Sequence, residues 1–450
     1  MTGTARRYEN GQVMILLVLG FVGLLGFAAL AIDIGMVYSD RRIAQNAADA
    51  AALAGAGRAG QQLKTLFVDD WDCGSGFNAA KSDAKDTAIE QALFNQFVIT
   101  RTVGITENVV TVDCSTGSSV TDNYLDVRVR IDKQTPSTFS HMIFGGQLAN
   151  TVEAVARVTP KTPFAGGASI VSLTSNCGSH FDKGIVFGGN GDTVIDGGGI
   201  HSNSCLTLNG SSGNIQVNGG GIEYDADDVY KNNGGMTVSP APGPVGDKVV
   251  LDPLPDLCAG VPAAPNSGNP NLLLPGRYNH IISINNNQTK IMRSGLYCLR
   301  NGIRVNGGGT LQSEVLGGST EGGVTIVVLN GNFDVAGNAT VKLKAPPPDC
   351  DAVADAYDLT CPPAVPGMLI YLPPGSNGNV SIAGTSDSEY TGTVYALDGF
   401  IDIGGTTSTI ADIWAQFVAS SILIHGDTTL NIHYDGDLNF QWPARLNLQR

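Results

Sequence analysis

Residues 13–32 read VMILLVLGFVGLLGFAALAI, a run of twenty residues without a charge. As an α-helix this run rises about 30 Å, which matches the hydrocarbon core of a bilayer. The stretch therefore predicts one transmembrane helix over 13–32, preceded by a short terminal segment, 1–12. The alternative is a cleaved signal peptide, because Ala29 and Ala31 are small residues of the kind that a signal peptidase needs. Cleavage there would cut a helical pattern that continues without a break.

Charges on the two sides of the apolar run indicate its orientation. Two arginines precede it, at positions 6 and 7, whereas two acidic residues offset Arg41 and Arg42 behind it. The positive-inside rule therefore favours a cytoplasmic N-terminus. We expect a single-pass protein of the cytoplasmic (inner) membrane, with segment 1–12 inside and the bulk of the chain extracytoplasmic.

An alanine-rich helical pattern continues from Met36 to about Leu66. Small or apolar residues recur there at steps of three and four and form a stripe that permits close packing against another helix: Ile43, Ala47, Ala50, Ala51 and Ala54. The stripe therefore predicts a helix that packs closely against a neighbouring helix.

Three motifs lie at the start of this helix and along it: Gly11-Gln12, AIDIG at 31–35, and DRRIAQNAADAAALA at 40–54. They resemble the N-terminus of the TadG-like Flp pilus-assembly proteins, and alternating strand patterns at 125–130 and 152–158 extend the likeness to about residue 160. The resemblance implies an α+β pilin-like region over 33–160, with other pilus-assembly proteins as partners and no chemistry. It also implies a helix-packing or assembly motif made of Asp33, Arg41, Arg42, Gln45, Asn46 and Asp49.

Two positions refine this expectation. Leu16 stands five residues after Gly11, where prepilin-like members of the wider system carry Glu, so processing by a prepilin peptidase is not expected. Asp33 is interpreted either as a charge contact that orients the helix in an assembly or as a carboxylate at the membrane surface.

From about residue 166 the helical period disappears, and short strand patterns alternate with turns rich in Gly, Asn and Asp. Two segments recur: IQVNGG at 215–220 returns as IRVNGG at 303–308, and NGNFDVAG at 330–337 returns as NGNVSIAG at 377–384. Such pairs favour stacked rungs, with Gly219 and Gly307 at corners that need left-handed backbone angles. The sequence predicts a mainly-β domain over 166–450, most consistent with a parallel β-helix, with a β-sandwich as the alternative.

Prolines mark two insertions in this domain. One runs from Val238 to Pro275 and cannot supply backbone donors to a ladder throughout. The other, rich in Pro and Asp, is closed by Cys350 and Cys361 and is expected to be a stapled surface loop.

All eight cysteines lie beyond the apolar run, and none forms a C-x-x-C motif. This placement suits disulfides in an oxidising compartment rather than a zinc site. Loop composition favours a Cys350–Cys361 bridge, and proximity along the chain favours three further pairs: Cys177 with Cys205, Cys258 with Cys298, and Cys73 with Cys114.

Composition and motifs exclude several functions. The formal net charge of −15 would repel a phosphate backbone, so no nucleic-acid partner is expected. Asp196 lies in a motif, VIDGGG, that resembles a strand of pectin-degrading enzymes, but no second carboxylate motif accompanies it. Acidic clusters at 223–228 and 349–358 raise the alternative of calcium, although such runs are more often solvated loops.

The sequence therefore predicts a non-enzymatic, membrane-anchored structural or adhesive component associated with Flp pilus assembly, with no cofactor. The alternative is a membrane-tethered carbohydrate-binding or carbohydrate-active β-helix protein.

Overall fold

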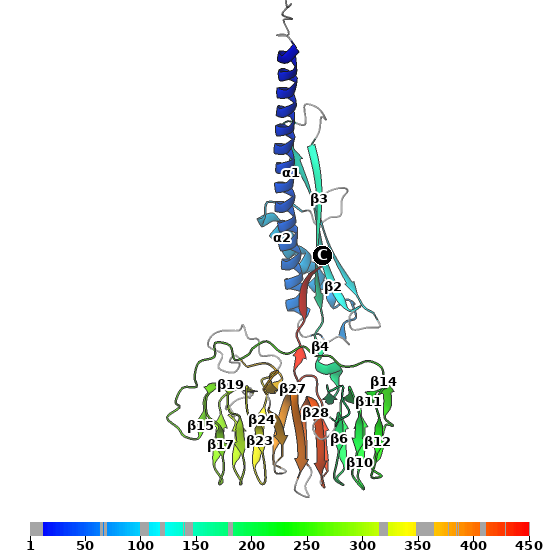
Figure 1. Ribbon diagram of the computed structural model, residues 1–450, viewed down its shortest axis with the longest axis vertical. Coiled ribbons are helices and arrows are strands. Elements are labelled where there is room, and N and C mark those ends of the chain that lie inside the picture. The colour runs from blue at the N-terminus through cyan, green and yellow to red at the C-terminus, as the bar shows by residue number, and fades with distance from the viewer. Residues whose placement is uncertain are drawn as a thin grey trace, which may run out of the picture. The chain divides into compact units, whose positions relative to one another are not determined.

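The computed structural model describes residues 12–63, 66, 70–99, 108–117, 122–137, 139, 147–178, 183–314, 323–347, 364–376, 378–383, 385, 387–405, 411–427 and 429–449. The chain divides into two compact units. The first unit holds residues 1–162 together with 443–450, and the second holds 163–442. The second unit is thus an insertion between two parts of the first (Figure 1).

The first unit combines a long helix, a second helix and an antiparallel sheet. The sheet order is β1-β2-β3-β31, so the last strand of the chain lies beside β3. The elements are α1 (Gln12–Leu63), α2 (Phe77–Phe94), β1 (Val109–Ser115), β2 (Tyr124–Pro136), β3 (Gln147–Thr159) and β31 (Arg445–Gln449). This α+β unit with one long apolar helix is the arrangement that the sequence predicts.

Small side chains form the core between the two helices and the sheet. The alanines of α1 that are buried are Ala44, Ala47, Ala48, Ala51, Ala52, Ala56 and Ala59. Those of α2 recur every fourth residue: Ala80, Ala84, Ala88 and Ala92. A Cβ atom added at Gly55 would lie 2.6 Å from the carbonyl oxygen of Ala84, so only glycine allows the two helices to approach this closely. The expected stripe was misplaced in part, because Ile43 is 53% exposed and Ala50 and Ala54 are half-buried.

In the second unit, the 25 strands of one sheet line up in three columns of parallel strands. The first column runs through β15 (Leu272–Leu273), β18 (Thr289–Met292), β21 (Thr310–Ser313), β24 (Thr340–Lys344), β27 (Glu389–Gly405), β28 (Ala411–Gly426), β29 (Leu430–His433), β7 (Thr193–Asp196), β10 (Asn214–Asn218) and β13 (Thr237–Ser239).

The second column runs through β16 (Gly276–Tyr278), β19 (Gly295–Leu299), β22 (Val324–Val328), β25 (Met368–Leu372), β27, β28, β5 (Ile170–Ser172), β8 (Ile200–Ser202), β11 (Ile222–Asp225) and β14 (Gly243–Val245). The third runs through β17 (Ile282–Ile284), β20 (Ile303–Val305), β23 (Phe333–Val335), β26 (Asn379–Ile382), β27, β28, β6 (Ile185–Phe187), β9 (Leu206–Leu208) and β12 (Tyr230–Asn232). β4 (Thr162–Pro163), the 3₁₀ helix Phe164–Gly167 and β30 (Gln441–Trp442) complete the elements.

This arrangement has the parallel ladders of a β-helix and none of the antiparallel pairing that the alternative, a β-sandwich, would need within the described sheet. The chain starts in the middle of the columns and winds to one end at β14. After a long connection it resumes at the other end, at β15, and winds back until β28 pairs with β27 on one side and with β5 and β6 on the other. Figure 1 shows β27 and β28 between the two sets of strands.

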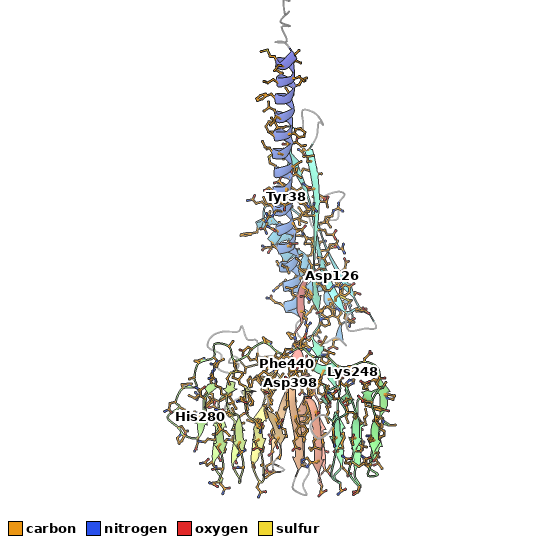
Figure 2. All side chains as sticks on the ribbon, viewed as in Figure 1. Tyr38, Asp126, Lys248, His280, Asp398 and Phe440 are labelled. Atoms are coloured by element: carbon orange, nitrogen blue, oxygen red, sulfur yellow. A yellow bond between two sulfur atoms is a disulfide. The ribbon has the colours of Figure 1, made fainter. Side chains whose placement is uncertain are left out.

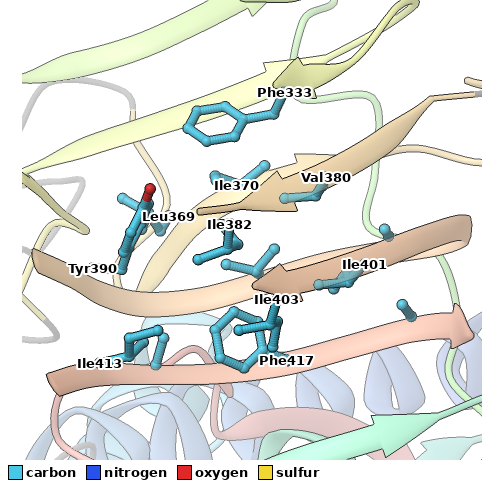
Figure 3. Packing of buried hydrophobic residues seen from close by; sticks show 14 of the residues in the cluster. Phe333, Leu369, Ile370, Val380, Ile382, Tyr390, Ile401, Ile403, Ile413 and Phe417 are labelled. Carbon is cyan, nitrogen blue, oxygen red and sulfur yellow. The ribbon is translucent and has the colours of Figure 1, made fainter. Parts of the chain in front are cut away.

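Ladders of stacked aliphatic and aromatic side chains fill the core between the columns. Phe333, Val380 and Ile401 lie in register on neighbouring strands of the third column, as Figure 3 shows. The repeat at 330–337 and 377–384 is therefore a stacked pair, as predicted. The pair at 215–220 and 303–308 is not, because β10 and β20 belong to different columns. Gly219 and Gly307 do have the expected positive φ, 96° and 55°.

A second apolar cluster lies on the outer side of the second column. Leu254 and Cys258 come from the proline-rich stretch 238–275 and join Tyr371 and Tyr395, which point outward from the sheet and stack at 5.5 Å. The stretch contributes short strands only near its ends. The prediction that this stretch supplies few backbone donors to the strand ladders is thus confirmed. Its apolar side chains instead cover the outward-facing apolar residues of the second column.

A buried polar network joins the beginning and the end of the second unit. The Nε2 atom of Gln416 donates to the carbonyl oxygens of Phe164 and Ala168, at 2.9 and 2.8 Å. The backbone N–H of Gln416 donates to Oδ1 of Asn439, and the hydroxyl of Thr393 contacts both side chains. All three side chains are buried, so each hydrogen bond replaces water that cannot enter.

The predicted domain boundary needs one correction. Segment 166–450 was expected to form the β-domain, but residues 443–450 belong to the first unit, where β31 pairs antiparallel with β3. Apolar and polar residues alternate in β31, a pattern that is compatible with an edge strand of either unit. Its pairing with β3 places it in the first unit.

Replacing Val305 by Asp is expected to destabilise the second unit by about 3 to 5 kcal/mol, because a charge without a partner would be buried. Val305 is fully buried and lies in register with Ile284 and Val335. Ser283→Asp is the matched control: Ser283 is exposed beside Arg304 and should tolerate the charge. Thermal and urea unfolding of both variants measure the difference, and equal stability would contradict the inward assignment of Val305.

Candidate anchoring and assembly site on the first helix

The first half of α1 presents its apolar side chains to the surroundings on every side. The large hydrophobic residues between Val13 and Ile32 are each between 47% and 77% exposed. In the described residues this is the helix long and apolar enough to cross a membrane, with a mean hydropathy of 2.8 over its most apolar window. Since none of the described residues of the unit covers this surface, a lipid environment is its natural solvent, which indicates membrane anchoring.

The helix continues without interruption from this exposed half into the folded unit. Its 52 residues span about 78 Å, more than twice the thickness of the hydrocarbon core. The first half of the helix is bare and its second half carries the alanine core. A cut at residues 29–31, as the signal-peptide alternative requires, would fall within this helix.

Two acidic residues attach α1 to the sheet just beyond the apolar span. Asp33 is 2% exposed, and the backbone N–H of Phe139 donates to its two carboxylate oxygens at 3.1 and 3.3 Å. About two turns later, the hydroxyl of Thr135 donates to Asp40 at 2.7 Å. Asp33 is therefore buried in a contact within the unit, and its role in an assembly or at the membrane surface stays a prediction.

The remaining motif residues divide between two sides of the helix. Gln45 is half-buried and donates to Asp49 at 2.8 Å and to the carbonyl oxygen of Glu153 at 3.1 Å. Arg41, Arg42 and Asn46 are exposed instead. Among the described residues, neither arginine has an ion-pair partner, so both guanidinium groups are available to another molecule or to lipid headgroups. Tyr38, labelled in Figure 2, is 64% exposed nearby.

Ion pairs fasten β2 to β3 behind the helix. Arg157 makes two parallel hydrogen bonds to Asp126, both at 2.8 Å, and its guanidinium lies 3.5 Å from the ring centre of Tyr124. The hydrogen bond to Asp126 raises the pKa of Arg157 above its ordinary value, so the charge is held throughout the working range. Sequence reasoning missed this pair and the Asp40–Thr135 contact, because both join residues distant in sequence.

The described residues of the second unit contain three histidine–carboxylate pairs, one in each column. His201 lies 3.0 Å from Glu223, His425 lies 2.8 Å from Asp402, and His433 lies 3.4 Å from Asp196. They do not converge on one place. Asp196, the residue singled out by the pectinase-like motif, also accepts a hydrogen bond from Asn218 at 2.7 Å. It acts as a link between neighbouring strands.

The acidic cluster at 223–228 is divided in the same way. Glu223 pairs with His201, and Asp225 pairs with Lys248, which Figure 2 labels. Among the described residues, one group has atoms close enough together for a metal ion: Cys177, Cys205 and Asp228. The two sulfur atoms of that group are joined in a disulfide and are not thiolate ligands. Calcium binding stays a prediction, and the cluster at 349–358 lies outside the described residues.

The six cysteines that the structure describes form three disulfides, the pairs that proximity along the chain favoured: Cys73–Cys114 in the first unit, and Cys177–Cys205 and Cys258–Cys298 in the second. Their Cα–Cα distances lie between 5.6 and 5.9 Å, within the usual range for a bridge. The Cys350–Cys361 prediction lies outside the described residues.

A long, bare apolar helix that continues into a small α+β unit, with a large inserted unit of parallel strands, defines a membrane-anchored protein with a β-rich extension. Residues 11–58 match the family model described as putative Flp pilus-assembly TadE/G-like. The match covers α1 almost completely and about a tenth of the chain. This helix is therefore a TadE/G-like domain, as the resemblance indicated, whereas the likeness from 59 to 160 lies outside the matched range. Neither the curated proteins nor the solved structures compared with the chain give a match.

The His425–Asp402 pair gives the second unit a defined pH dependence. The hydrogen bond from His425 to Asp402 raises the pKa of the imidazole above 6.5. Because the folded-state pKa is the higher one, the stabilisation is fully present below about pH 6.5 and is lost as pH rises through the folded-state value. Its size is small, since the imidazole side chain is 46% exposed. NMR titration should show a lower pKa for His425 in Asp402→Asn, and an unchanged pKa would contradict the pairing.

Proposed function

We propose that this chain is a non-enzymatic structural or adhesive component of Flp pilus assembly. In this proposal α1 anchors it in the cytoplasmic membrane, segment 1–12 lies in the cytoplasm, and both folded units lie outside. The observation that carries the proposal is the match of residues 11–58 to the pilus-assembly family. Matched residues 12–58 lie in a helix whose first half is exposed and apolar and whose second half packs in the core of the first unit.

The exposed side of α1 supplies the contact with other assembly proteins. Arg41, Arg42 and Asn46 are exposed and lie between about two and four turns beyond the apolar span. Charged and amide groups beyond a membrane span orient the helix and determine which partner it binds. The apolar half of α1, residues 13–32, packs against other helices or lipid. The disulfides of both units support an oxidising compartment for the bulk of the chain.

A scaffolding role without a cofactor is supported by how the polar residues of the second unit are used. Its histidines and carboxylates pair across neighbouring strands in separate columns and strengthen ladders. Chemistry would require an acid and a base that face one substrate position. The alternative, a carbohydrate-binding or carbohydrate-active β-helix, has one observation in its favour, the exposed Trp414 on the sheet surface.

Charge reversal at both arginines tests the assembly role. We expect Arg41→Glu with Arg42→Glu to abolish pilus formation in a deletion strain, although the protein remains membrane-bound at wild-type level, because neither side chain is needed for folding. Lys231→Glu, on the exposed strand β12, is the matched control and should restore pili. Electron microscopy and sheared-pilus yields provide the measurement. Normal pili in the deletion strain itself would overturn the proposal, and a fusion reporter after residue 66 tests the orientation.

Incubation with polysaccharides tests the non-enzymatic role. The purified chain should release no oligosaccharide from pectin, xylan or chitin, and Asp196→Asn should unfold like the wild type because the amide keeps an oxygen for Asn218. Turnover by the wild-type protein that disappears in Asp196→Asn would show that the carboxylate is catalytic.

A further inference from the structure

The third column of the second unit has a free strand edge at each end. β12 pairs with β9 and β17 pairs with β20, and no other described strand pairs with either of them. Each end strand therefore presents a row of backbone N–H and C=O groups without a strand partner. Figure 1 shows β12 and β17 at opposite ends of the row of strands.

The second column, in contrast, is protected at both ends. Segment 262–264 lies along β16: the N–H of Ala264 donates to the carbonyl oxygen of Arg277 at 3.1 Å, and the N–H of Arg277 donates to Pro262 at 2.8 Å. At the other end, the middle residue of β14 is Pro244, which has no N–H to offer. A further strand therefore has better access to the third column.

The free backbone groups at the two ends of the third column are complementary. The carbonyl oxygen of Val229 accepts a hydrogen bond from β9, so Tyr230, the next residue, directs its own N–H and C=O to the free side. The N–H of Ile282 donates toward β20, so its neighbour Ser283 directs its backbone groups to the free side of β17. A parallel ladder between β12 and β17 needs this alternation.

The stacked side chains of the column define the register of such a ladder. One inward row begins on β17 and ends on β12: Ile282, Ile303, Phe333, Val380, Ile401, Ile422, Ile185, Leu206 and Tyr230. A second copy of the chain, placed with its Ile282 beside Tyr230, continues the row by one more strand. In that register the N–H of Tyr230 faces the carbonyl oxygen of Ile281 of the second copy.

An exposed apolar side chain precedes each of the two end strands. Val229 is 47% exposed and Ile281 is 48% exposed, although both lie next to the buried row. Each stands one position before the end of that row, so the same register places Val229 beside Ile281 of the second copy. Contact between them removes apolar surface from water at both ends at once.

Charge of opposite sign gathers toward the two ends. Residues 184–230, from β6 to β12, include six acidic residues and neither Lys nor Arg. Residues 257–313, which include β15 to β21, contain five Lys or Arg and no acidic residue. Asp227 is exposed just before β12, and Arg300 is exposed beside the turn that precedes β17, where its N–H donates to Tyr278. Such a distribution attracts one end of a copy to the opposite end of another.

We propose that the second unit binds a second copy of this chain head to tail, with β12 of one copy pairing in parallel with β17 of the next. Two different surfaces meet in this contact, so every added copy again offers a free end and the association extends to a linear array. A strand from an unrelated protein would occupy one edge and leave the opposite charge at the other end unused. The inference goes beyond the proposed function and does not depend on it.

The first test uses the full chain in detergent micelles, followed by sedimentation velocity over a range of protein concentrations. We expect dimers and longer species that increase with concentration. Their dissociation constant should rise about tenfold or more between low salt and about 0.5 M salt, because opposite charges at the two ends are then screened. A chain that stays monomeric at every concentration would overturn the proposal.

A variant pair separates this contact from association through α1. Ile281→Asp should weaken association about tenfold or more, because the new carboxylate would be buried against Val229 of the neighbouring copy. Val250→Asp is the matched control: Val250 is 85% exposed in the connection between β14 and β15, and this variant should associate like the wild type. Circular dichroism and thermal unfolding confirm that both variants are folded. Association that is unchanged in Ile281→Asp would assign it to α1 and contradict the proposal.

Cysteine cross-linking between copies tests the register. Lys231 and Ser283 are exposed and follow Tyr230 and Ile282, so the proposed ladder makes them neighbours on adjacent strands. Chains with Lys231→Cys mixed with chains with Ser283→Cys should form a disulfide-linked dimer on oxidation, because adjacent strands lie about 4.8 Å apart. Each variant alone should remain unlinked. No dimer in the mixture, or an equal yield of dimer from Lys231→Cys alone, would rule out head-to-tail pairing.

Discussion

The buried side chain of Gln416 is the contact on which the second unit depends. Its amide donates to two carbonyl oxygens of the incoming segment, while its backbone N–H donates to Asn439 of the outgoing segment. Without that amide two buried carbonyl groups would lose their donor, at a cost of about 1 to 3 kcal/mol each. Because one strand holds both segments, the chain leaves the unit where it enters, which is the requirement for inserting 280 residues between neighbouring strands of another sheet.

The strand that carries Gln416 also joins the two halves of the core. The rungs from β5 to β14 and those from β15 to β27 are wound separately, and each would end in an open ladder without β28. Phe417 and Ile422 of β28 continue the stacked rows of both halves, so one apolar core runs through all columns. The same strand turns Trp414 outward. One strand therefore both closes the fold and carries the exposed aromatic residue.

The sequence predicts those features that depend on local periodicity. The uncharged run 13–32, the alternating rows and the glycine corners are all present, because each is a property of a few consecutive residues. Gln416 could not be recognised, since a polar residue at an outward position normally faces water, and here a distant segment covers it. The six-residue helix motif was predicted as one site, yet Asp33 and Gln45 hydrogen-bond to other parts of the unit, Asp49 accepts from Gln45, and Arg41, Arg42 and Asn46 are exposed. Which side of α1 is covered depends on β2 and β3, and the helix sequence does not contain that information.

Cysteine cross-linking measures the closure of the two halves most directly. Leu423 of β28 and Val186 of β6 are register neighbours that both point outward from the third column. Leu423→Cys combined with Val186→Cys should form a disulfide in the oxidised, folded chain, detected by peptide mapping, because adjacent strands bring the Cα atoms within bridging distance. Leu423→Cys combined with Lys231→Cys should remain unlinked, because two strands, β6 and β9, lie between β28 and β12. A bridge in the second pair, or none in the first, would contradict the closure by β28.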